Sequence, residues 1–234
     1  MQIKKIIYYL GIDANPVSHL EKIISGIGGF LSIFSIIYIS SLYVGVEAVY
    51  VIPSMGASAV LLFAAPHSAL GQLWNVIGGH LISAAIGVTC ARYLPGGIAA
   101  AASVGLAIGV MYYARCLHPP GGATALSAVI GGPHIHALGY EYILTPIAIN
   151  TVTILLVAVL FNALFRWRRY PTFLIPKESD LDSAHKAYAP VDHANFVYAL
   201  SQMDTFIDVT EDDLLKIYQL ATGREVISNS KKFT

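Results

Sequence analysis

Long apolar stretches separated by short polar breaks occupy most of the chain up to Phe165. A helix needs roughly 20 apolar residues to cross a bilayer, and two further apolar segments, 48–65 and 117–131, are shorter and interrupted by proline and glycine. The pattern predicts an all-α membrane protein with four full transmembrane helices and two short ones. The four long stretches are about 23–44, 72–92, 97–115 and 142–165.

The two short segments share a sequence. Pro-Ser-Met-Gly-Ala-Ser-Ala at 53–59 recurs as Pro-Pro-Gly-Gly-Ala-Thr-Ala at 119–125, and the match continues downstream with one inserted residue. We therefore expect two homologous repeat units, 23–94 and 95–169, each reading long, short, long. Short segments broken by proline and glycine at matching positions in two halves are typical of transporters whose solute site lies near the bilayer midplane.

Two topologies fit this pattern. If the short segments are re-entrant half-helices, the chain crosses four times and the units are parallel; if they are broken helices that cross, there are six crossings and the units are inverted. The excess of Lys and Arg on the cytoplasmic side puts both termini in the cytoplasm either way, because the topologies only exchange Arg92 and Arg115 between the sides. We favour the re-entrant topology because 117–131 is short for a crossing, and because Arg92 and Arg166 would then both end a unit on the cytoplasmic side.

Composition supports a membrane location. Hydrophobic residues make up 56% of the chain and charged residues 12%, with a mean hydropathy of +0.63, which is too apolar for an ordinary soluble domain. The formal net charge is zero, so a nucleic-acid partner, which requires a basic surface, is not expected. Cys90 and Cys116 show no ligand spacing and are expected to be buried thiols. We predict no cofactor.

Charged residues gather at the two ends of the chain. Residues 1–22 are expected to form an N-terminal cytoplasmic segment without a removable signal peptide, followed by a transmembrane domain over 23–169. Residues 170–190 are typical of a linker, and 191–234 predict a small helical cytoplasmic tail for docking or oligomer contacts. We expect an integral membrane protein of the bacterial inner (plasma) membrane, in contact with the lipid bilayer, and leave open whether it forms a homo-oligomer.

The second short segment carries the strongest signal for chemistry. Proline is accommodated in the first turn of a helix, so Pro-Pro-Gly-Gly at 119–122 predicts a helix start with uncovered backbone N–H groups. The positive end of such a helix stabilises an anion without a buried formal charge. Pro-Ser-Met-Gly at 53–56 predicts a second such end. Two ends that meet would form a small polar site, to which Ser54, Ser58, Thr124 and Ser127 add hydroxyl groups.

The motif around these prolines resembles that of a known family. Cys116-Leu-His118-Pro-Pro-Gly-Gly-Ala-Thr-Ala125 resembles the signature of the HPP family of integral membrane proteins, and 53–63 and 75–80 resemble its first-half motifs. The resemblance covers about 20–168, and the tail is similar to the C-terminal extension of bacterial members. It implies four membrane-spanning helices and a transporter or channel, with nitrite as the leading candidate substrate.

We place the predicted anion path between the two helix starts. Small residues there are expected to matter by size, so Gly121→Leu or Gly122→Leu should abolish flux without preventing membrane insertion. Arg115 either attracts the anion to a mouth of the path or anchors at the headgroups, and His118 is a protonatable group at the helix tip or only a cap. The predicted substrate-binding residues are Pro53, Ser54, Met55, Gly56, Ala57, Ser58, Arg115, His118, Pro119, Pro120, Gly121, Gly122, Ala123 and Thr124.

Polar side chains inside the long helices are candidates for a proton or polar relay. Asn75, His80 and Asn150 would be costly in a bilayer unless they faced the protein interior. For His80 we favour a bond to a neighbouring helix, with a proton relay as the alternative. His134 and His136 lack further ligands at a diagnostic spacing, so no metal site is predicted.

We therefore predict a membrane transporter or channel for a small monovalent anion, with nitrite as the leading candidate. One alternative is a carrier of a cation or neutral solute, for which Glu47 and Glu141 would be the sensitive positions. Another is a membrane scaffold or sensor that acts through the tail. An enzyme is not expected, because the sequence shows no Ser/His, Cys/His or HExxH-like constellation.

Overall fold

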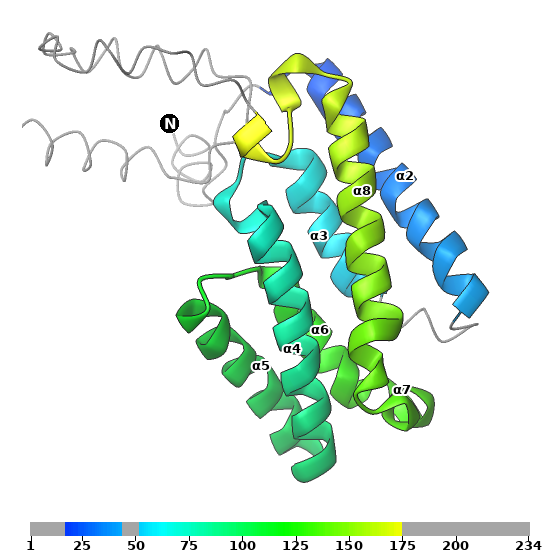
Figure 1. The fold of residues 1–234 in the computed structure, drawn as a ribbon, viewed down its shortest axis with the longest axis vertical. Coiled ribbons are helices and arrows are strands. Elements are labelled where there is room, and N and C mark those ends of the chain that lie inside the picture. Colours follow the sequence, from blue (N-terminus) through cyan, green and yellow to red (C-terminus); the bar gives the residue numbers. More distant parts are fainter. Residues whose placement is uncertain (1–16, 44–51, 175–234) are drawn as a thin grey trace, which may run out of the picture. The chain divides into compact units, whose positions relative to one another are not determined.

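The computed structural model describes residues 17–43 and 52–174, and every regular element within them is helical (Figure 1). Four helices are long and apolar enough to cross a membrane, and a shorter apolar helix lies between the first two. These findings confirm the predicted all-α class with four long helices. Glu47, the segment before residue 17 and the tail lie outside the described residues.

The elements are α2 (His19–Tyr43), α3 (Ile52–Ala64), η2 (Ala69–Gly71), α4 (Leu73–Tyr93), α5 (Gly96–Tyr113), α6 (Pro119–Ile130), α7 (Gly132–Leu138), η3 (Ile143–Ala148), α8 (Ile149–Ala163), η4 (Arg166–Arg168) and η5 (Thr172–Leu174).

Prolines mark where the two short helices begin. α6 starts at Pro119, with His118 as its extended N-cap residue, and Pro53 is the second residue of α3. Proline fits the first helical turn because the N–H that it lacks would have no partner within the helix there. The breaks that the sequence places in both short segments are therefore helix starts.

Hydrogen bonds near the helix ends fix the directions of α2 and α8. The Arg168 guanidinium donates to Ser25 Oγ at 3.2 Å, near the start of α2. Ser40 Oγ donates to Asn150 Oδ1 at 2.8 Å, near the end of α2 and the start of α8. The two helices are therefore antiparallel. Figure 1 shows that α4 runs in the same direction as α2, while α3 runs in the opposite direction.

α6 lies against α4 and runs alongside it in the same direction. In the first turn of α6, a Cβ on Gly121 would lie 2.7 Å from Gly79 O. Further along both helices, a Cβ on Gly87 would lie 2.9 Å from Ala125 Cα. The backbones approach this closely because glycine carries no side chain, so the pair is packed tightly along much of α6.

α3 also packs near the middle of α4, but it runs in the direction opposite to α6. Ser58 contacts His80 in the middle part of α4. Toward the end of α3, Leu62 O accepts a hydrogen bond of 3.1 Å from Asn162 Nδ2, near the end of α8. From the level of His80, the two short helices therefore run to opposite ends of the bundle (Figure 1).

These directions match the inverted alternative rather than the re-entrant topology that the sequence favoured. In a re-entrant unit the two long helices would be antiparallel, whereas α2 and α4 run the same way (Figure 1). The short α6 suffices because residues 114–118 carry the chain inward before it begins; Trp74 Nε1 donates to Ala114 O at 3.0 Å beside the first turn of α4. Apolar length alone did not reveal this inward segment. Homology of the two units stays a prediction.

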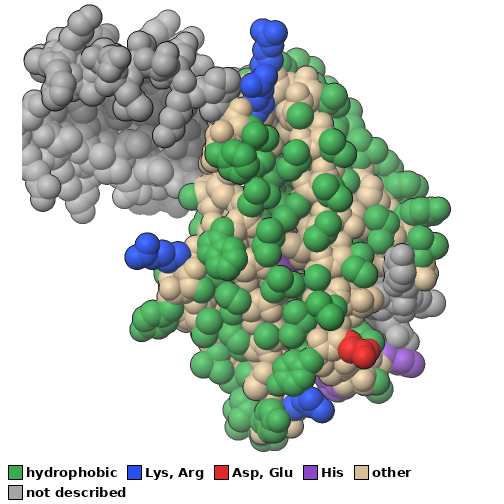
Figure 2. Space-filling model, viewed as in Figure 1, with side chains coloured by type: hydrophobic (Ala, Val, Ile, Leu, Met, Phe, Trp, Pro, Cys, Tyr) green, Lys and Arg blue, Asp and Glu red, His purple; other side chains and the backbone are tan. Residues whose placement is uncertain are grey.

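The bundle exposes apolar side chains and buries polar ones. Phe30 is 67% exposed, Phe34 58% and Tyr113 93%, whereas Ser83 and Asn162 have no exposure. Figure 2 shows hydrophobic side chains over most of the face in view, with few charged ones. Exposed apolar surface on this scale requires a lipid environment, so the chain is an integral membrane protein.

Candidate functional site

Two histidines, a serine and a threonine meet in the middle of the bundle. Ser58 Oγ on α3 lies 2.8 Å from His80 Nε2 on α4 and 2.9 Å from His118 Nε2 at the start of α6. His80 Nδ1 lies 2.7 Å from Thr124 Oγ1 on α6. All four side chains have 0% exposure. We call Ser58, His80, His118 and Thr124 the central cluster.

Local backbone geometry holds the two rings in place. His118 is extended, with φ −137°, because a following proline disfavours the helical conformation. Its Nδ1 lies 2.8 Å from Leu70 O, and its ring centroid lies 4.9 Å from that of His80, edge to face. Gly79 allows this approach, because a Cβ at that position would overlap His118 Cβ.

Ser58 and Thr124 occupy matching positions in the repeated motif. Each hydroxyl also lies near the carbonyl one helical turn earlier, at 3.1 Å for Ser58 and Ser54 O and at 3.3 Å for Thr124 and Pro120 O. The two hydroxyls approach opposite nitrogens of a single ring, that of His80. The two copies of the motif therefore meet at one histidine of a long helix.

The predicted binding residues divide between an inner and an outer face of the short helices. Ser54 is buried beside the cluster, Met55 lies in the apolar core, and Pro120 and Gly121 are buried against neighbouring helices. Apart from Arg115 and the residues of the central cluster, six predicted residues are left, and all six are partly or fully exposed. These six are Pro53, Gly56, Ala57, Pro119, Gly122 and Ala123.

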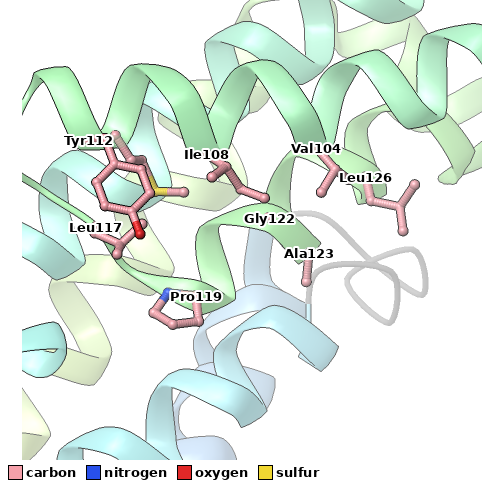
Figure 3. Close-up of a pocket in the computed structure, with 9 residues that line it drawn as sticks. Val104, Ile108, Tyr112, Leu117, Pro119, Gly122, Ala123 and Leu126 are labelled. Atoms are coloured by element: carbon pink, nitrogen blue, oxygen red, sulfur yellow. The ribbon is translucent and has the colours of Figure 1, made fainter. Parts of the chain in front are cut away.

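Apolar grooves run along the outer faces of α3 and α6. One groove, between α5 and α6, has a volume of about 510 Å³ and is bordered by Pro119, Gly122 and Ala123 (Figure 3). A second groove, of about 360 Å³, lies between α2 and α3 and is bordered by Gly56. These predicted residues therefore line outer grooves rather than the central cluster.

The start of α6 offers fewer backbone donors than the sequence led us to expect. Pro119 and Pro120 have no N–H, and the Gly121 N–H donates to His118 O at 2.8 Å. The expectation of uncovered N–H groups is therefore wrong for the first three positions of this helix. The dipole of α6 still places positive partial charge there, but the polar contacts come from side chains.

Gly121 packs against α4. The substitutions Gly121→Leu and Gly122→Leu, which were expected to block flux, therefore test helix packing and the outer groove. The Cβ position of Gly121 is 2.7 Å from Gly79 O and 2.8 Å from Ser83 Oγ, so Gly121→Leu would force α6 away from α4. At Gly122 the nearest atom is Val104 Cγ1 at 3.8 Å, and a side chain there would enter the outer groove. Neither substitution reports on the central cluster.

Three further candidates have no contact with the cluster. Arg115 is exposed and has a positive φ of 53° after the end of α5. Asn75 Nδ2 donates to Leu117 O at 2.8 Å and so orients the loop before α6. Asn150 accepts a hydrogen bond from Ser40. Of the predicted relay residues, only the histidine of α4 joins the central cluster.

Some features of the site were missed from the sequence. Tyr142 OH donates to Thr124 O at 3.2 Å, and the carbonyl of Leu70 faces a histidine ring. The serine–histidine contact was also unexpected, and the absence of enzyme activity stays a prediction. Within the described residues, no three His, Cys, Asp or Glu side chains gather as metal ligands. The 66-residue offset of the repeat pairs Ser58 with Thr124, but no sequence signal ties either to the histidines.

A family model described as "HPP, transmembrane region" matches residues 14–171. The chain belongs to the HPP transmembrane family. This HPP chain is similar to two transmembrane proteins of Dictyostelium discoideum. One is 39% identical over 132 residues, which make up 54% of this chain and 42% of the relative. The other is 35% identical over 170 residues, which make up 68% of this chain and 58% of the relative.

The chain spans about half the length of these relatives. No solved structure matches this HPP chain significantly. Family membership confirms the resemblance drawn from the motif around His118, and the apolar helices confirm an integral membrane protein. Nitrite as substrate, a bacterial inner membrane and the cytoplasmic location of the termini stay predictions.

Proposed function

We propose that this HPP protein is a membrane transporter for a small monovalent anion, with nitrite as the leading candidate, and that the anion binds at the central cluster. The observation that carries the proposal is that α6 begins at the cluster, whereas α3 passes it at Ser58, and that the two short helices run on to opposite ends of the bundle (Figure 1). The positive N-terminal end of α6 therefore lies at the cluster, and that of α3 lies between one and two turns before Ser58. Interrupted helices that point these ends at the midplane bind anionic groups in transporters.

The side chains at the cluster favour an anion over a cation. Ser58, Thr124 and the two imidazole rings can supply hydrogen-bond donors to an anion once the hydrogen bonds among them open. In the part of the chain that the structure describes, no Asp or Glu side chain contacts the cluster. A cation at this depth would call for carboxylates or a set of carbonyl groups, and Glu141 is exposed outside the cluster.

Complete burial of the cluster favours a carrier over an open channel. All four side chains have 0% exposure, so a solute reaches them only after helices move. Two three-helix units of opposite direction are the arrangement from which transporters build alternating access. The proposal includes a bacterial inner membrane and cytoplasmic termini, and leaves the oligomeric state open.

Uptake into proteoliposomes that contain the full chain tests the proposal. Nitrite, nitrate, formate, chloride and potassium are compared with empty vesicles, because nitrous acid crosses lipid unaided. We expect saturable nitrite uptake above the empty-vesicle level and no potassium uptake. If nitrite stayed at the empty-vesicle level while another anion moved, the nitrite assignment would be lost. Movement of potassium alone would overturn the anion proposal.

Two variants connect the uptake to the cluster. His80→Ala removes the ring that joins the two short helices and should abolish saturable uptake. His134→Ala changes an exposed histidine of α7 and should leave uptake unchanged. If both variants transported like the unaltered protein, the path would lie elsewhere. Removal of residues 191–234 should also preserve uptake, whereas a scaffold or sensor acting through the tail would lose its function.

A further inference from the structure

The central cluster forms a row of hydrogen bonds whose direction is set at one end. Leu70 O can only accept, so the His118 Nδ1 that faces it at 2.8 Å carries the hydrogen. In the neutral ring Nε2 then accepts, and the Ser58 hydroxyl donates to it. Ser58 Oγ in turn accepts from His80 Nε2–H, which leaves Nδ1 of that ring to accept from Thr124. Every hydrogen of the neutral row is thereby assigned.

Each hydroxyl of the row has a second acceptor within reach. If a proton is added to His118 Nε2, the Ser58 hydroxyl can turn to Ser54 O at 3.1 Å and accept from both rings. If the proton is added instead to Nδ1 of the other ring, Thr124 can turn to Pro120 O at 3.3 Å. One extra proton can therefore be held on either ring without the loss of a ring hydrogen bond.

Among the residues that the structure describes, the groups around the rings do not supply a compensating charge. Tyr142 contacts the backbone of Thr124, and Cys116 packs against Gly78; both are uncharged near neutral pH. Among the described residues, the other titratable side chains on or beside the packed helices have no hydrogen bond to either ring. They include His67 after α3, Cys90, Arg92 and Tyr93 on α4, Tyr112 and Tyr113 on α5, Arg115 before α6, His134 and His136 on α7, Tyr140 and Glu141 after it, and Arg168 and Tyr170 after α8.

An added proton would therefore be a buried cation beside the positive end of α6, which is strongly unfavourable on its own. An anion at the same helix end would reduce this penalty, and the proton would in turn strengthen anion binding. Such coupling is reciprocal, and its usual range corresponds to about 5- to 150-fold in affinity. Proton and anion would then each bind the cluster more tightly when the other is present.

We infer that the row of Ser58, His80, His118 and Thr124 is a proton-binding site that makes anion transport by this protein proton-coupled, with one proton carried per anion. The inference rests on the proposed function and deepens it. The ring centroids are 4.9 Å apart, so two cationic rings would repel each other and a second proton is disfavoured. A monovalent anion and a proton move together from one solution to the other, so the cycle transfers no net charge.

Proton movement in the unaltered protein gives the first test. Full-length protein in proteoliposomes is supplied with nitrite while the pH gradient and the membrane potential are set independently, and a pH-sensitive dye reports proton movement. We expect uptake driven by an alkaline interior, one proton per nitrite, and no response to potential after subtraction of empty vesicles. Uptake that follows the potential without proton movement would overturn the inference and leave anion transport standing.

Two substitutions test the rings separately. His80→Gln retains a donor at the position of Nε2, and His118→Asn retains a donor for Leu70 O, but neither side chain can take up a proton. We expect gradient-driven net uptake to fall at least about fivefold, the lower end of the usual coupling range. Exchange of labelled for unlabelled nitrite, which needs no release of the proton, should persist. His134→Gln serves as the matched control.

The outcomes separate the two claims. If both variants fold, exchange persists and net uptake falls, the inference is supported. If net uptake in both variants still responds fully to the pH gradient, the rings do not carry the proton and the inference fails. If the unaltered protein moves no anion in either mode, the proposed function fails and the inference with it. The proton stoichiometry of the unaltered protein decides the matter should the variants be unstable.

Discussion

α3 and α6 begin with the same motif, but the surrounding helices hold them in different ways. At the start of α6, Gly79 and Gly121 bring two backbones so close that a Cβ at either position would clash. Along the outer face of α3, no atom lies within 4 Å of a Cβ built on Gly56, and the same holds for Gly26 and Gly29 on α2, although a Cβ on Gly28 would overlap the Phe63 side chain of α3. Both helices offer a hydroxyl to the same histidine of α4, but only α6 begins with a histidine of its own.

This difference separates a half of the site that is packed tightly against α4 from a half that borders a groove. α6 and the His118 ring pack closely against α4, whereas the groove between α2 and α3 leaves space beside Gly56. We expect the central cluster to open by movement of α3 against α2 while α6 stays with α4. The substitutions below test this contrast, in order of decreasing effect.

Gly79→Ala should have the largest effect. The added Cβ would overlap His118 Cβ and lie 3.3 Å from Cys116 O, and neither neighbour can move without displacing α6. Overpacking of this kind costs about 3 kcal/mol at the upper end of the usual range. Thermal unfolding of the purified protein in detergent measures the loss, with Gly29→Ala as the control that should be neutral or slightly stabilising. Equal stability of the two variants would refute the contrast.

Gly121→Ala and Gly122→Ala test the same contrast within one helix turn. The Gly121 Cβ position lies 2.7 Å from Gly79 O, a backbone atom, so we expect a loss of about 2 kcal/mol. The Gly122 position is 3.8 Å from Val104 Cγ1, an ordinary contact, so its substitution should be nearly neutral. The order of the two melting temperatures decides the outcome, and a reversed order would mean that α6 presents its other face to α4.

Apolar length and proline position predicted the elements well. The stretch 72–92 became α4 at Leu73–Tyr93, and 97–115 became α5 at Gly96–Tyr113. Helix direction could not be predicted in this way. It depends on the non-helical connection at 114–118, which no apolar count reveals, and the charge rule gave the same total for both topologies.

The site was predictable only in part. The repeat pointed to Ser58 and Thr124, and the unusual cost of a histidine at membrane depth pointed to His80. The convergence of these residues on one ring could not be read from the chain, because it depends on how α3, α4 and α6 pack. Gly56 and Gly122 share the motif, yet the helix turns them outward, since residues two positions from an inward hydroxyl lie on a different face.

Ser58→Ala and Thr124→Val compare the hydroxyls of the two halves. Ser58 bonds to both rings and Thr124 to one, and each buried ring nitrogen left without a partner costs about 1 kcal/mol or more. Ser58→Ala should therefore lower the unfolding free energy by about 1 kcal/mol more than Thr124→Val. Denaturant titration in detergent measures both, and Ser58→Thr controls for the retained hydroxyl. Equal losses would mean that one of the two Ser58 contacts contributes nothing to stability.

Tyr142→Phe should have the smallest effect, although Tyr142 is buried and contacts the α6 half of the site. Its hydroxyl donates at 3.2 Å to Thr124 O, a carbonyl that, one turn into α6, also accepts the helical N–H four residues later. Loss of the hydroxyl therefore leaves no acceptor unpaired, and about 0.5 kcal/mol is expected. Tyr170→Phe, which removes a buried bond of 2.8 Å to Gly71 O, should cost more in the same melting experiment.

Because the Thr124 side chain is untouched, Tyr142→Phe should also leave proton-driven nitrite uptake unchanged. A loss of uptake as large as that expected for His80→Gln would show instead that the hydrogen-bonded row continues into Tyr142.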